Sequence, residues 1–205
     1  MKHLFRKGVE GKPVLLLLHG TGGDEESLLP LAGLLDPEAS VLSVRGNVLE
    51  NGMPRFFRRI AEGVFDEEDL VFRTQELHNF VHDVSLQYGF TREQLVAVGY
   101  SNGANIAASL LFHHEKAMRG AMLLHPMVPK RGVPLPELTG LPVFISAGTN
   151  DPLVPKDETE ELHSLLEGAG AEVTVHWESY GHQLTRPELE AAAEWYAKTM
   201  SVETV

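Results

Sequence analysis

One stretch decides the fold: Leu95-Val-Ala-Val-Gly99-Tyr-Ser101-Asn-Gly103-Ala-Asn-Ile-Ala-Ala108. Its first four residues are apolar and include three good strand formers, whereas the residues after Gly103 are mostly small or aliphatic with helical spacing. The pattern predicts a strand, a sharp turn and a helix, with Gly-x-Ser-x-Gly at the turn. Glycine suits both flanks of Ser101 because so tight a turn brings neighbouring backbone too close for a side chain.

Ser101 at this turn is the candidate nucleophile. A strained strand-to-helix turn exposes the serine hydroxyl at the carboxyl end of the strand, in front of the helix N-terminus. Backbone N–H groups and the helix dipole favour developing negative charge there. The same five-residue pattern also occurs in ordinary flexible loops. The assignment therefore depends on whether an acid and a histidine follow behind further strands.

Length and composition predict a single α/β domain that spans residues 1–205. The net charge of −12 argues against nucleic acid or an anionic membrane as a partner, since both need basic patches. The chain has no cysteine, which excludes disulfides, thiol nucleophiles and cysteine-based metal sites. Its apolar run Val14–Leu18 is too short for a membrane span or for the core of an export signal. We therefore expect a soluble, cytoplasmic protein.

The apolar runs give the order of elements along the chain. Strands are expected at residues 2–7, 13–18, 40–44, 94–98, 120–124, 141–147 and 172–177, and helices at 25–35, 67–88, 102–113, 157–167 and 185–199. Strands that alternate with helices predict a mostly parallel central sheet with helices on both faces and ligand sites at the carboxyl ends of the strands. Residues 45–66 form the longest irregular segment.

Two further side chains complete a candidate catalytic triad. Asp151 follows the strand at 141–147 and His182 follows the strand at 172–177, so that all three residues lie just past a strand. The order Ser101, Asp151, His182 is that of the α/β-hydrolase fold. A serine hydroxyl becomes a good nucleophile when an imidazole accepts its proton. A carboxylate on the other ring nitrogen fixes the tautomer and stabilises the imidazolium.

Other titratable residues fit these roles less well. His176 lies within a strand, His163 lies on a helix, and His125 ends an earlier strand, before Asp151 in the sequence. Asp157 opens a helix several residues beyond its strand. The segment around Asp151 is also a common turn sequence, so the assignment rests on the three triad residues together.

Such a triad needs an oxyanion hole of two backbone N–H groups aimed at the oxygen that becomes negative. The expected donors are those of Asn102, directly after the nucleophile, and Thr21, in the loop His19–Gly23 after the first buried strand. The glycines of this loop also allow a dinucleotide-binding interpretation. That alternative fails because Glu25 occupies the third glycine position, within an acidic run that would repel a pyrophosphate.

No metal or cofactor site is predicted. His78 and His82 lie four residues apart on a helix, but the intervening residues lack the glutamate of His-Glu-x-x-His. His113-His114-Glu115 ends a helix, where the dipole favours cationic side chains. We interpret both groups as solvated helix faces.

With these residues placed, the chain resembles the phospholipase/carboxylesterase family, which includes the acyl-protein thioesterases, over nearly all of its length. The motifs that carry the resemblance are Leu18-His-Gly-Thr-Gly-Gly23, Gly99-Tyr-Ser-Asn-Gly-Ala-Asn105, Gly148-Thr-Asn-Asp-Pro-Leu-Val-Pro155 and Gly181-His182. The segment Val44–Arg59 looks closest to a bacillary subgroup, the MhqD-like hydrolases associated with the methylhydroquinone response. The resemblance implies a compact serine esterase of the α/β-hydrolase fold, without a large lid domain and often a homodimer.

Two departures from the family bear on the substrate. Thr21 stands where thioesterase members typically carry leucine, and Asn102 stands where many carry glutamine. Because both positions act through backbone N–H groups, the catalytic assignment is unaffected. An acyl-protein substrate is not supported.

The segment 45–66 is expected to form the rim of the site and the acyl pocket. Met53, Phe56 and Phe57 are the candidate lining residues, and the alternative is that they pack the segment onto the core. The arginines of the segment either bind an anionic group or pair with acids such as those of residues 66–69; they are Arg45, Arg55, Arg58 and Arg59.

The sequence thus predicts a serine hydrolase that cleaves small-molecule carboxylic esters through an acyl-enzyme. Thioester or lysophospholipid cleavage by the same triad is the first alternative. A metal-dependent, ring-cleaving hydroquinone dioxygenase would need a site of two histidines and one carboxylate, for which the sequence shows no clear pattern. A non-catalytic binding protein of hydrolase fold would commonly lack a triad member, whereas this chain has all three.

Overall fold

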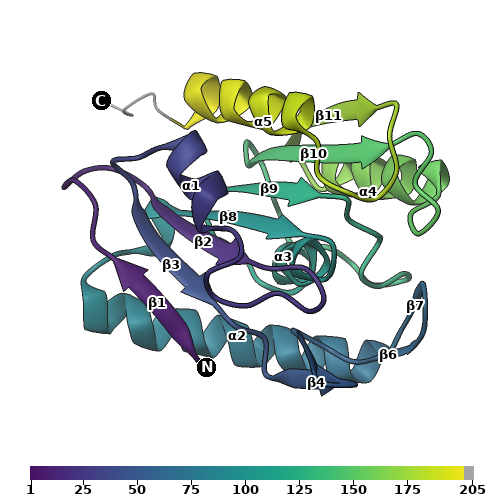
Figure 1. The fold of residues 1–205 in the computed structure, drawn as a ribbon, viewed down its shortest axis with the longest axis horizontal. Helices are drawn as coiled ribbons and strands as arrows, with labels where there is room; N and C mark the ends of the chain where they lie inside the picture. The colour runs from purple at the N-terminus through teal and green to yellow at the C-terminus, as the bar shows by residue number, and fades with distance from the viewer. Residues whose placement is uncertain (201–205) are drawn as a thin grey trace.

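A seven-stranded sheet forms the centre of the computed structural model, which describes residues 1–200 (Figure 1). In spatial order its strands are β1 (His3–Arg6), β3 (Ser40–Val44), β2 (Val14–Leu18), β8 (Leu95–Tyr100), β9 (Gly120–Leu124), β10 (Pro142–Gly148) and β11 (Glu172–Glu178). Strand β1 pairs with β3 in the antiparallel sense, and the other neighbours pair in parallel. The prediction of a mostly parallel sheet is confirmed.

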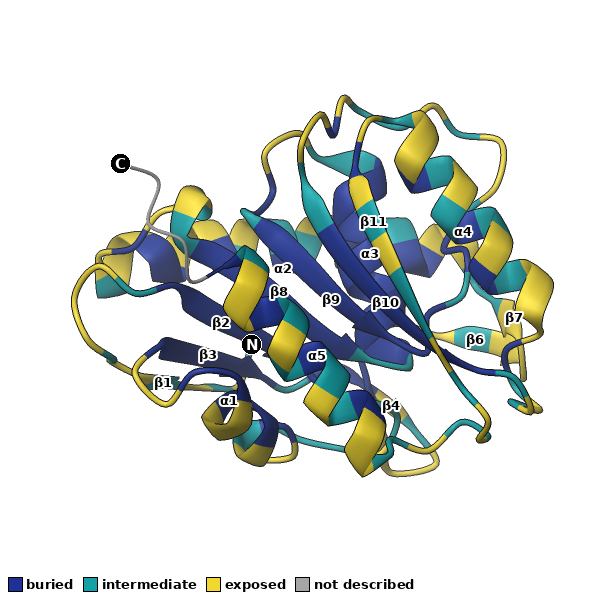
Figure 2. Cartoon of the chain, turned by 90° about the horizontal axis from the view of Figure 1, so that it is seen from above, coloured by how far each residue is buried: buried dark blue, intermediate teal, exposed yellow. Residues whose placement is uncertain are grey.

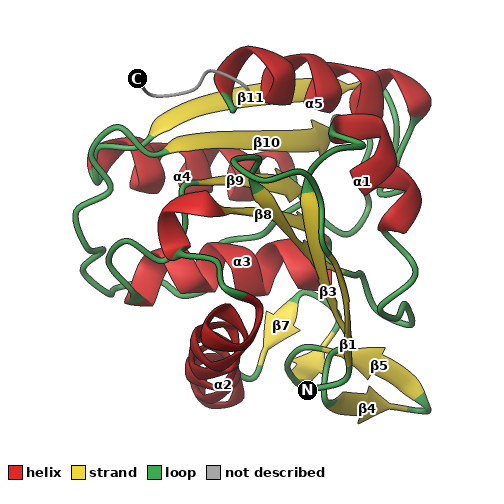
Figure 3. Ribbon diagram, turned by 90° about the vertical axis from the view of Figure 1, so that its left-hand side faces the viewer, coloured by secondary structure: helices red, strands yellow, loops and turns green. Residues whose placement is uncertain are grey.

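Helices cover both faces of this sheet (Figure 3). The α-helices are α1 (Leu29–Leu35), α2 (Glu67–Tyr88), α3 (Asn102–His113), α4 (Lys156–Gly168) and α5 (Arg186–Thr199), and a short 3₁₀ helix spans Arg92–Gln94. Helices α1 and α5 pack on one face, and α2, α3 and α4 pack on the other. The predicted helix at 25–35 begins only at Leu29. The side chain of Asp24 caps a turn before it.

Burial on both faces explains why the central strands are apolar throughout (Figure 2). Successive side chains of a strand point to opposite faces. In β2, Val14, Leu16 and Leu18 belong to the core under α2 and α3, whereas Leu15 and Leu17 belong to the core under α1 and α5. The sheet therefore separates two apolar layers.

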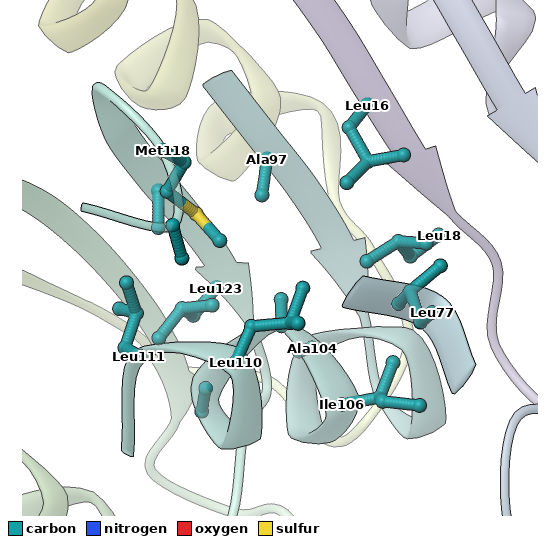
Figure 4. Close-up of a cluster of buried hydrophobic side chains, with 14 of the residues drawn as sticks. Leu16, Leu18, Leu77, Ala97, Ala104, Ile106, Leu110, Leu111, Met118 and Leu123 are labelled. Carbon is teal, nitrogen blue, oxygen red and sulfur yellow. The ribbon is translucent and has the colours of Figure 1, made fainter. Parts of the chain in front are cut away.

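Helix α3, which follows the turn at Ser101, is buried along nearly its whole length. Ala104 and Leu110 of this helix share one buried cluster with Ala97 of β8 and Leu123 of β9 (Figure 4). Small residues let the helix lie close to the sheet, which holds its first turn firmly behind Ser101.

The segment 45–66 is not irregular, which corrects the sequence expectation. It forms two small hairpins, β4 (Val48–Glu50) with β5 (Met53–Arg55) and β6 (Arg59–Ala61) with β7 (Val64–Phe65). Asn51 and Gly52 join the first pair with φ of 51° and 79°. Asn-Gly with two positive φ angles is a strong hairpin signal, and it was present in the sequence. This is the longest insertion between the sheet strands and helices of residues 1–200, and it is not a large lid.

The chain order places a crevice between β2 and β8. From β2 the chain adds β3 on one side, and from β8 it adds β9, β10 and β11 on the other. At such a switch point the loops after the two strands diverge, and ligands bind between them. Within residues 1–200, no helix combines the length and the apolar character needed to cross a membrane.

Candidate active site

The backbone at Ser101 is strained, as a nucleophile turn requires. Ser101 has φ 51° and ψ −113°, between β8 and α3, a conformation that costs a non-glycine residue about 1–3 kcal/mol. A Cβ atom on Gly103 would lie 1.9 Å from the carbonyl oxygen of Leu18, and one on Gly99 would lie 2.5 Å from that of Gly103. The N–H of Ser101 donates to the carbonyl of Leu124 over 2.8 Å. Packing around the two glycines therefore fixes the turn.

The three side chains of the predicted triad lie in contact. Nε2 of His182 is 2.8 Å from Oγ of Ser101, and its Nδ1 is 2.7 Å from Oδ2 of Asp151. Since the carboxylate can only accept, this pattern assigns the imidazole proton to Nδ1 and leaves Nε2 to accept from the serine hydroxyl. The hydroxyl of Tyr100 donates to the carbonyl of His182 over 2.9 Å and helps to hold its loop.

Asp151 is a carboxylate whose hydrogen bonds outweigh the effect of burial. Its Oδ1 accepts from the N–H groups of Leu153 and Val154 over 2.8 and 3.1 Å. Burial raises the pKa of Asp151, but the hydrogen bonds from His182 and the two N–H groups, together with the charge of His182, lower the pKa below its ordinary value. The loop after β10 thus supplies both the acid and the backbone donors that hold it.

A second histidine, which the sequence analysis set aside, also contacts Asp151. Nδ1 of His125 lies 3.0 Å from Oδ2 of Asp151, and its Nε2 lies 3.0 Å from Oε1 of Glu188. His125 was set aside because it precedes Asp151 in the sequence. The available signal was its position directly after the buried strand 120–124, at the same sheet edge as Ser101. Glu188 also forms a capping box with Thr185 at the start of α5.

The loop after β2 places the N–H group of Thr21 near Ser101. The N–H of Gly22 donates to Pro54 and that of Gly23 to Gly20. Within residues 1–200, the N–H groups of Thr21 and Asn102 donate to no other group. Thr21 and Asn102 line the same cleft as Ser101. The two predicted oxyanion donors therefore lie beside the nucleophile with free N–H groups.

The first hairpin of the segment 45–66, and the residues after it, hold both of these positions. Nη1 of Arg55 donates to Oγ1 of Thr21 over 2.5 Å, and its Nε donates to the carbonyl of Phe57 over 3.1 Å. The N–H of Phe56 donates to the side-chain oxygen of Asn102 over 2.7 Å. The segment thus contacts the side chains of both residues that are predicted to supply the oxyanion N–H groups.

The aromatic residues predicted to line the acyl pocket lie in the core. Phe56 and Phe57 are 1% and 0% exposed and belong to the main apolar cluster. Met53 is 40% exposed and packs near Gly22. None of the three is among the residues around the cleft at Ser101. The structure therefore favours the alternative, packing onto the core, for both phenylalanines.

The four arginines of the segment are paired with acids. Arg45 contacts Glu25 and Asp24, Arg55 and Arg59 contact Glu50, and Arg58 contacts Asp66 and Asp69. Only Arg58 thus uses the acidic run at 66–69 that was expected to pair with them.

The cleft at Ser101 is small, and both polar and apolar side chains line it. Its volume is about 290 Å³, and its walls include Tyr100, Asn105, Met127 and Leu153 as well as Arg55 and Arg59. A larger cavity of about 620 Å³ lies between Arg92, Met118 and Leu141, at the opposite edge of the sheet. Since that cavity lacks the triad, the chemistry belongs to the smaller cleft.

His125, Asp151 and His182 bring two histidines and a carboxylate within 4.8 Å of one another. The sequence showed no such pattern. Both imidazoles, however, lie at hydrogen-bond distance from Oδ2 of Asp151, and Oδ1 accepts hydrogen bonds from two backbone N–H groups. The side chains of His125 and Asp151 are each 1% exposed, whereas a facial metal site needs open coordination positions. The geometry of the cluster is therefore that of a hydrogen-bonded group and not that of a metal site.

The histidines of α2 and α3 are not all solvated, which corrects the sequence interpretation. The rings of His78 and His114 stack at 3.8 Å, and both residues are half-buried. Burial, followed by the nearby charges of His114 and Arg92, lowers the pKa of His78 to about 4. Two stacked rings give no chelating geometry, so the expectation of no metal site here is unaffected.

The sequence of residues 59–204 matches the dienelactone hydrolase family. The chain belongs to this family. It is also 57% identical over 200 residues to the putative hydrolase MhqD of Bacillus subtilis (strain 168), covering 98% of this chain and 100% of that protein. The predicted resemblance to MhqD-like hydrolases is confirmed.

Solved structures extend the likeness to the whole fold. The Bacillus cereus carboxylesterase superposes with a TM-score of 0.96 at 66% identity, covering 97% of this chain and 94% of that one. YahD, determined with malic acid, superposes with a TM-score of 0.93 at 32% identity, covering 97% and 98%. The chain is therefore an ester hydrolase of the carboxylesterase type, with an α/β-hydrolase fold.

Proposed function

We propose that the chain hydrolyses small carboxylic esters through Ser101, His182 and Asp151. The observation that carries the proposal is the continuous chain of hydrogen bonds from Oγ of Ser101 through His182 to Asp151, at 2.8 and 2.7 Å. A serine in a strained turn, an imidazole in the correct tautomer and a buried carboxylate are the parts that acyl transfer needs. A binding protein would have no use for this alignment.

In the first half of the reaction, Oγ of Ser101 attacks the ester carbonyl carbon while Nε2 of His182 takes the hydroxyl proton. The carbonyl oxygen becomes negative and accepts from the N–H groups of Thr21 and Asn102, whose direction is set before the substrate arrives. The imidazolium, stabilised by Asp151, then gives its proton to the leaving alkoxide. An acyl-enzyme on Ser101 and a free alcohol result.

In the second half, water takes the place of the alcohol. His182 removes a proton from the water, and the resulting hydroxide attacks the acyl carbon through a second oxyanion in the same hole. Collapse of this intermediate returns the proton to Ser101 and releases the carboxylic acid. A thioester would follow the same steps with a thiolate as leaving group.

The dimensions of the cleft support a short acyl group. A volume of about 290 Å³ lies at the lower end of the range of about 300–1,000 Å³ typical of small-molecule sites. Polar side chains such as Asn105 and Arg55 share the walls with apolar ones, so the small volume, and not polarity, disfavours a long acyl chain. We propose that acetyl to butyryl esters are preferred over lauryl esters and lysophospholipids.

The test is hydrolysis of p-nitrophenyl esters from acetate to laurate by wild type and Ser101→Ala, with a chelator present throughout. Loss of the nucleophile is expected to lower kcat at least about 10³-fold. Wild-type kcat/KM is expected to fall steeply beyond butyrate. An acetyl thioester measured in parallel gives the preference between oxygen and sulfur leaving groups.

Ser164→Ala is the matched control because Ser164 is an exposed serine on α4 whose hydroxyl donates to the carbonyl of Glu160. It should keep wild-type activity. Equal activity of wild type and Ser101→Ala would contradict the proposed nucleophile. Activity that disappears with the chelator would instead point to a metal-dependent reaction.

A further inference from the structure

Beyond the proposed triad lies a buried polar cluster that the reaction steps above do not use. It consists of His125, after β9, Glu188, in the first turn of α5, and Ser146, on β10. His125 and Glu188 have relative exposures of 1% and 0%. Buried charged groups are retained only when they are paired and hydrogen-bonded. The arrangement of this cluster therefore calls for an explanation.

His125 lies between two carboxylates. Its Nδ1 is 3.0 Å from Oδ2 of Asp151, and its Nε2 is 3.0 Å from Oε1 of Glu188. The Nε2–H direction is poorly aligned with Oε1, so this second contact is an ion pair rather than a full hydrogen bond. A neutral imidazole has only one N–H and would turn a lone pair toward one of the carboxylates. An imidazolium, with both nitrogens protonated, presents an N–H to each carboxylate and fits this position better.

The surroundings of Glu188 keep it ionised. Its Oε1 accepts from the hydroxyl of Ser146, and its Oε2 accepts from the N–H of Thr185 over 3.1 Å. Burial raises the pKa of Glu188, but the contact with His125 and the hydrogen bond from Ser146 lower it overall. Burial likewise lowers the pKa of His125, but its contacts with the charged Glu188 and Asp151 raise it overall. The pair is thus a buried imidazolium–carboxylate pair.

Four titratable side chains face His125. Asp151 and Glu188 approach its two nitrogens, the ring of His182 lies 5.2 Å away, and the ring of Tyr100 lies 6.1 Å away on β8. The backbone is also constrained, because His125 has φ 54° and its N–H donates to the carbonyl of Ser146 over 2.9 Å. Contacts of the ring and of the backbone therefore hold His125 in one orientation.

We propose that His125, held as an imidazolium by Glu188, is a positioning residue that fixes the Asp151 carboxylate against His182. Oδ2 of Asp151 is shared by His125 and His182, and Oδ1 is shared by two backbone N–H groups. With every acceptor position occupied, the carboxylate cannot turn away from the catalytic imidazole. The inference rests on the proposed function, since it assigns a role within that triad.

The contact between His125 and Asp151 also affects the electrostatic environment of His182. A cation next to Asp151 partly offsets the negative charge of the carboxylate that faces His182. Glu188 also links the site to α5, which directly follows the loop carrying His182. The position of His182 and the net charge beside it therefore depend on one buried ion pair.

The experiment compares His125→Asn and His125→Ala in p-nitrophenyl acetate hydrolysis over the pH range, normalised by active-site titration. Asparagine tolerates a positive φ and keeps an N–H donor near the place of Nδ1, but it carries no charge. Misplacing the carboxylate is expected to lower kcat about 10²-fold in His125→Ala and clearly less in His125→Asn, with KM nearly unchanged. In both variants the acid limb of the kcat/KM profile should move to higher pH.

The protonation state is measured directly by NMR of the imidazole nitrogens in the wild type and in Glu188→Gln. In the wild type, one buried histidine, identified by its absence in His125→Asn, should carry two N–H protons at neutral pH. Glu188→Gln keeps the shape of the side chain and an acceptor for Thr185, but it removes the negative charge. His125 should then titrate at a lower pH, and kcat should fall.

His176→Asn is the matched control because His176 also pairs with a glutamate, Glu178 over 2.7 Å, but on β11 away from Ser101. It should leave kcat and the acid limb unchanged. Wild-type kcat and pH profile in folded His125 variants would overturn the inference, and so would a neutral His125 in the wild type. The second measurement decides the matter even if the His125 variants do not fold. Activity that does not need Ser101 would instead overturn the proposed function itself.

Discussion

The two sides of the cleft are built in different ways. The nucleophile side, residues 95–113, is one contiguous strand, turn and helix, and close backbone packing around Gly99 and Gly103 holds it. The imidazole side is assembled from the loops after β9, β10 and β11 and from the start of α5, and hydrogen bonds between buried charges hold it. The first side has no room for an added atom, whereas the second cannot lose a donor or an acceptor.

The difference shows how each side should fail. Added volume on the nucleophile side forces the backbone apart, and the fold should loosen along with the turn. Removal of a polar atom on the imidazole side leaves the backbone in place but disturbs the proton transfer between Ser101 and His182. Stability should therefore report on the first side, and kcat should report mainly on the second.

The largest effect is expected from Asp151→Asn, which tests the imidazole side at its centre. An amide in place of the carboxylate presents an N–H to His182 and favours the tautomer that cannot accept the serine proton. kcat is expected to fall about 10⁴-fold while the fold persists. Steady-state kinetics together with circular dichroism measure the two quantities. Asp157→Asn, at an exposed position in the first turn of α4, is the control. A decrease of kcat by less than tenfold in Asp151→Asn would contradict the proposed role of the carboxylate.

The nucleophile side is tested by Gly103→Ala. The added methyl carbon would lie 1.9 Å from the carbonyl oxygen of Leu18, so β2 and α3 must separate. The free energy of unfolding is expected to fall by at least about 3 kcal/mol, as for severe overpacking of a core. Urea denaturation followed by fluorescence measures it.

Gly33→Ala is the matched control, since it also adds one methyl group to a helical glycine. A Cβ there meets nothing within 4 Å, and Gly33 lies in α1. This variant should gain about 0.5–1 kcal/mol from reduced flexibility of the unfolded chain. Equal stabilities of the two variants would show that the close approach at Gly103 is not what holds the turn.

The same contrast explains what the sequence allowed us to predict. The strand–turn–helix at Ser101 follows from residues that are neighbours in the chain, as do the apolar strands of a doubly covered sheet. Asp151 and His182 were found because each lies just past a predicted strand, and parallel strands bring such loops to one edge. Local patterns were therefore sufficient for the triad positions.

His125 and Glu188 could not be found in this way. Their contact joins residues 63 positions apart, and nothing local in either segment indicates an ion pair. Phe56 and Phe57 had two interpretations because an aromatic residue suits a pocket wall and a core equally well, and only the packing of the hairpin segment decides between them. Of the two hairpins in the segment 45–66, the first was predictable from Asn51-Gly52.

The smallest effect is expected from Thr185→Ala, at the outer edge of the imidazole side. Oγ1 of Thr185 accepts from the N–H of Glu188 over 3.3 Å, and this cap closes the first turn of α5. Its loss should lower the free energy of unfolding by about 1 kcal/mol, measured by urea denaturation. Thr139→Ala, at an exposed loop threonine, should change it far less. Because this turn holds Glu188, which contacts His125, kcat should fall as well, but less than in Glu188→Gln. A variant with lower stability but wild-type kcat would show that the ion pair of His125 and Glu188 keeps its geometry without the cap. The imidazole side would then be more rigid than expected from its individual hydrogen bonds.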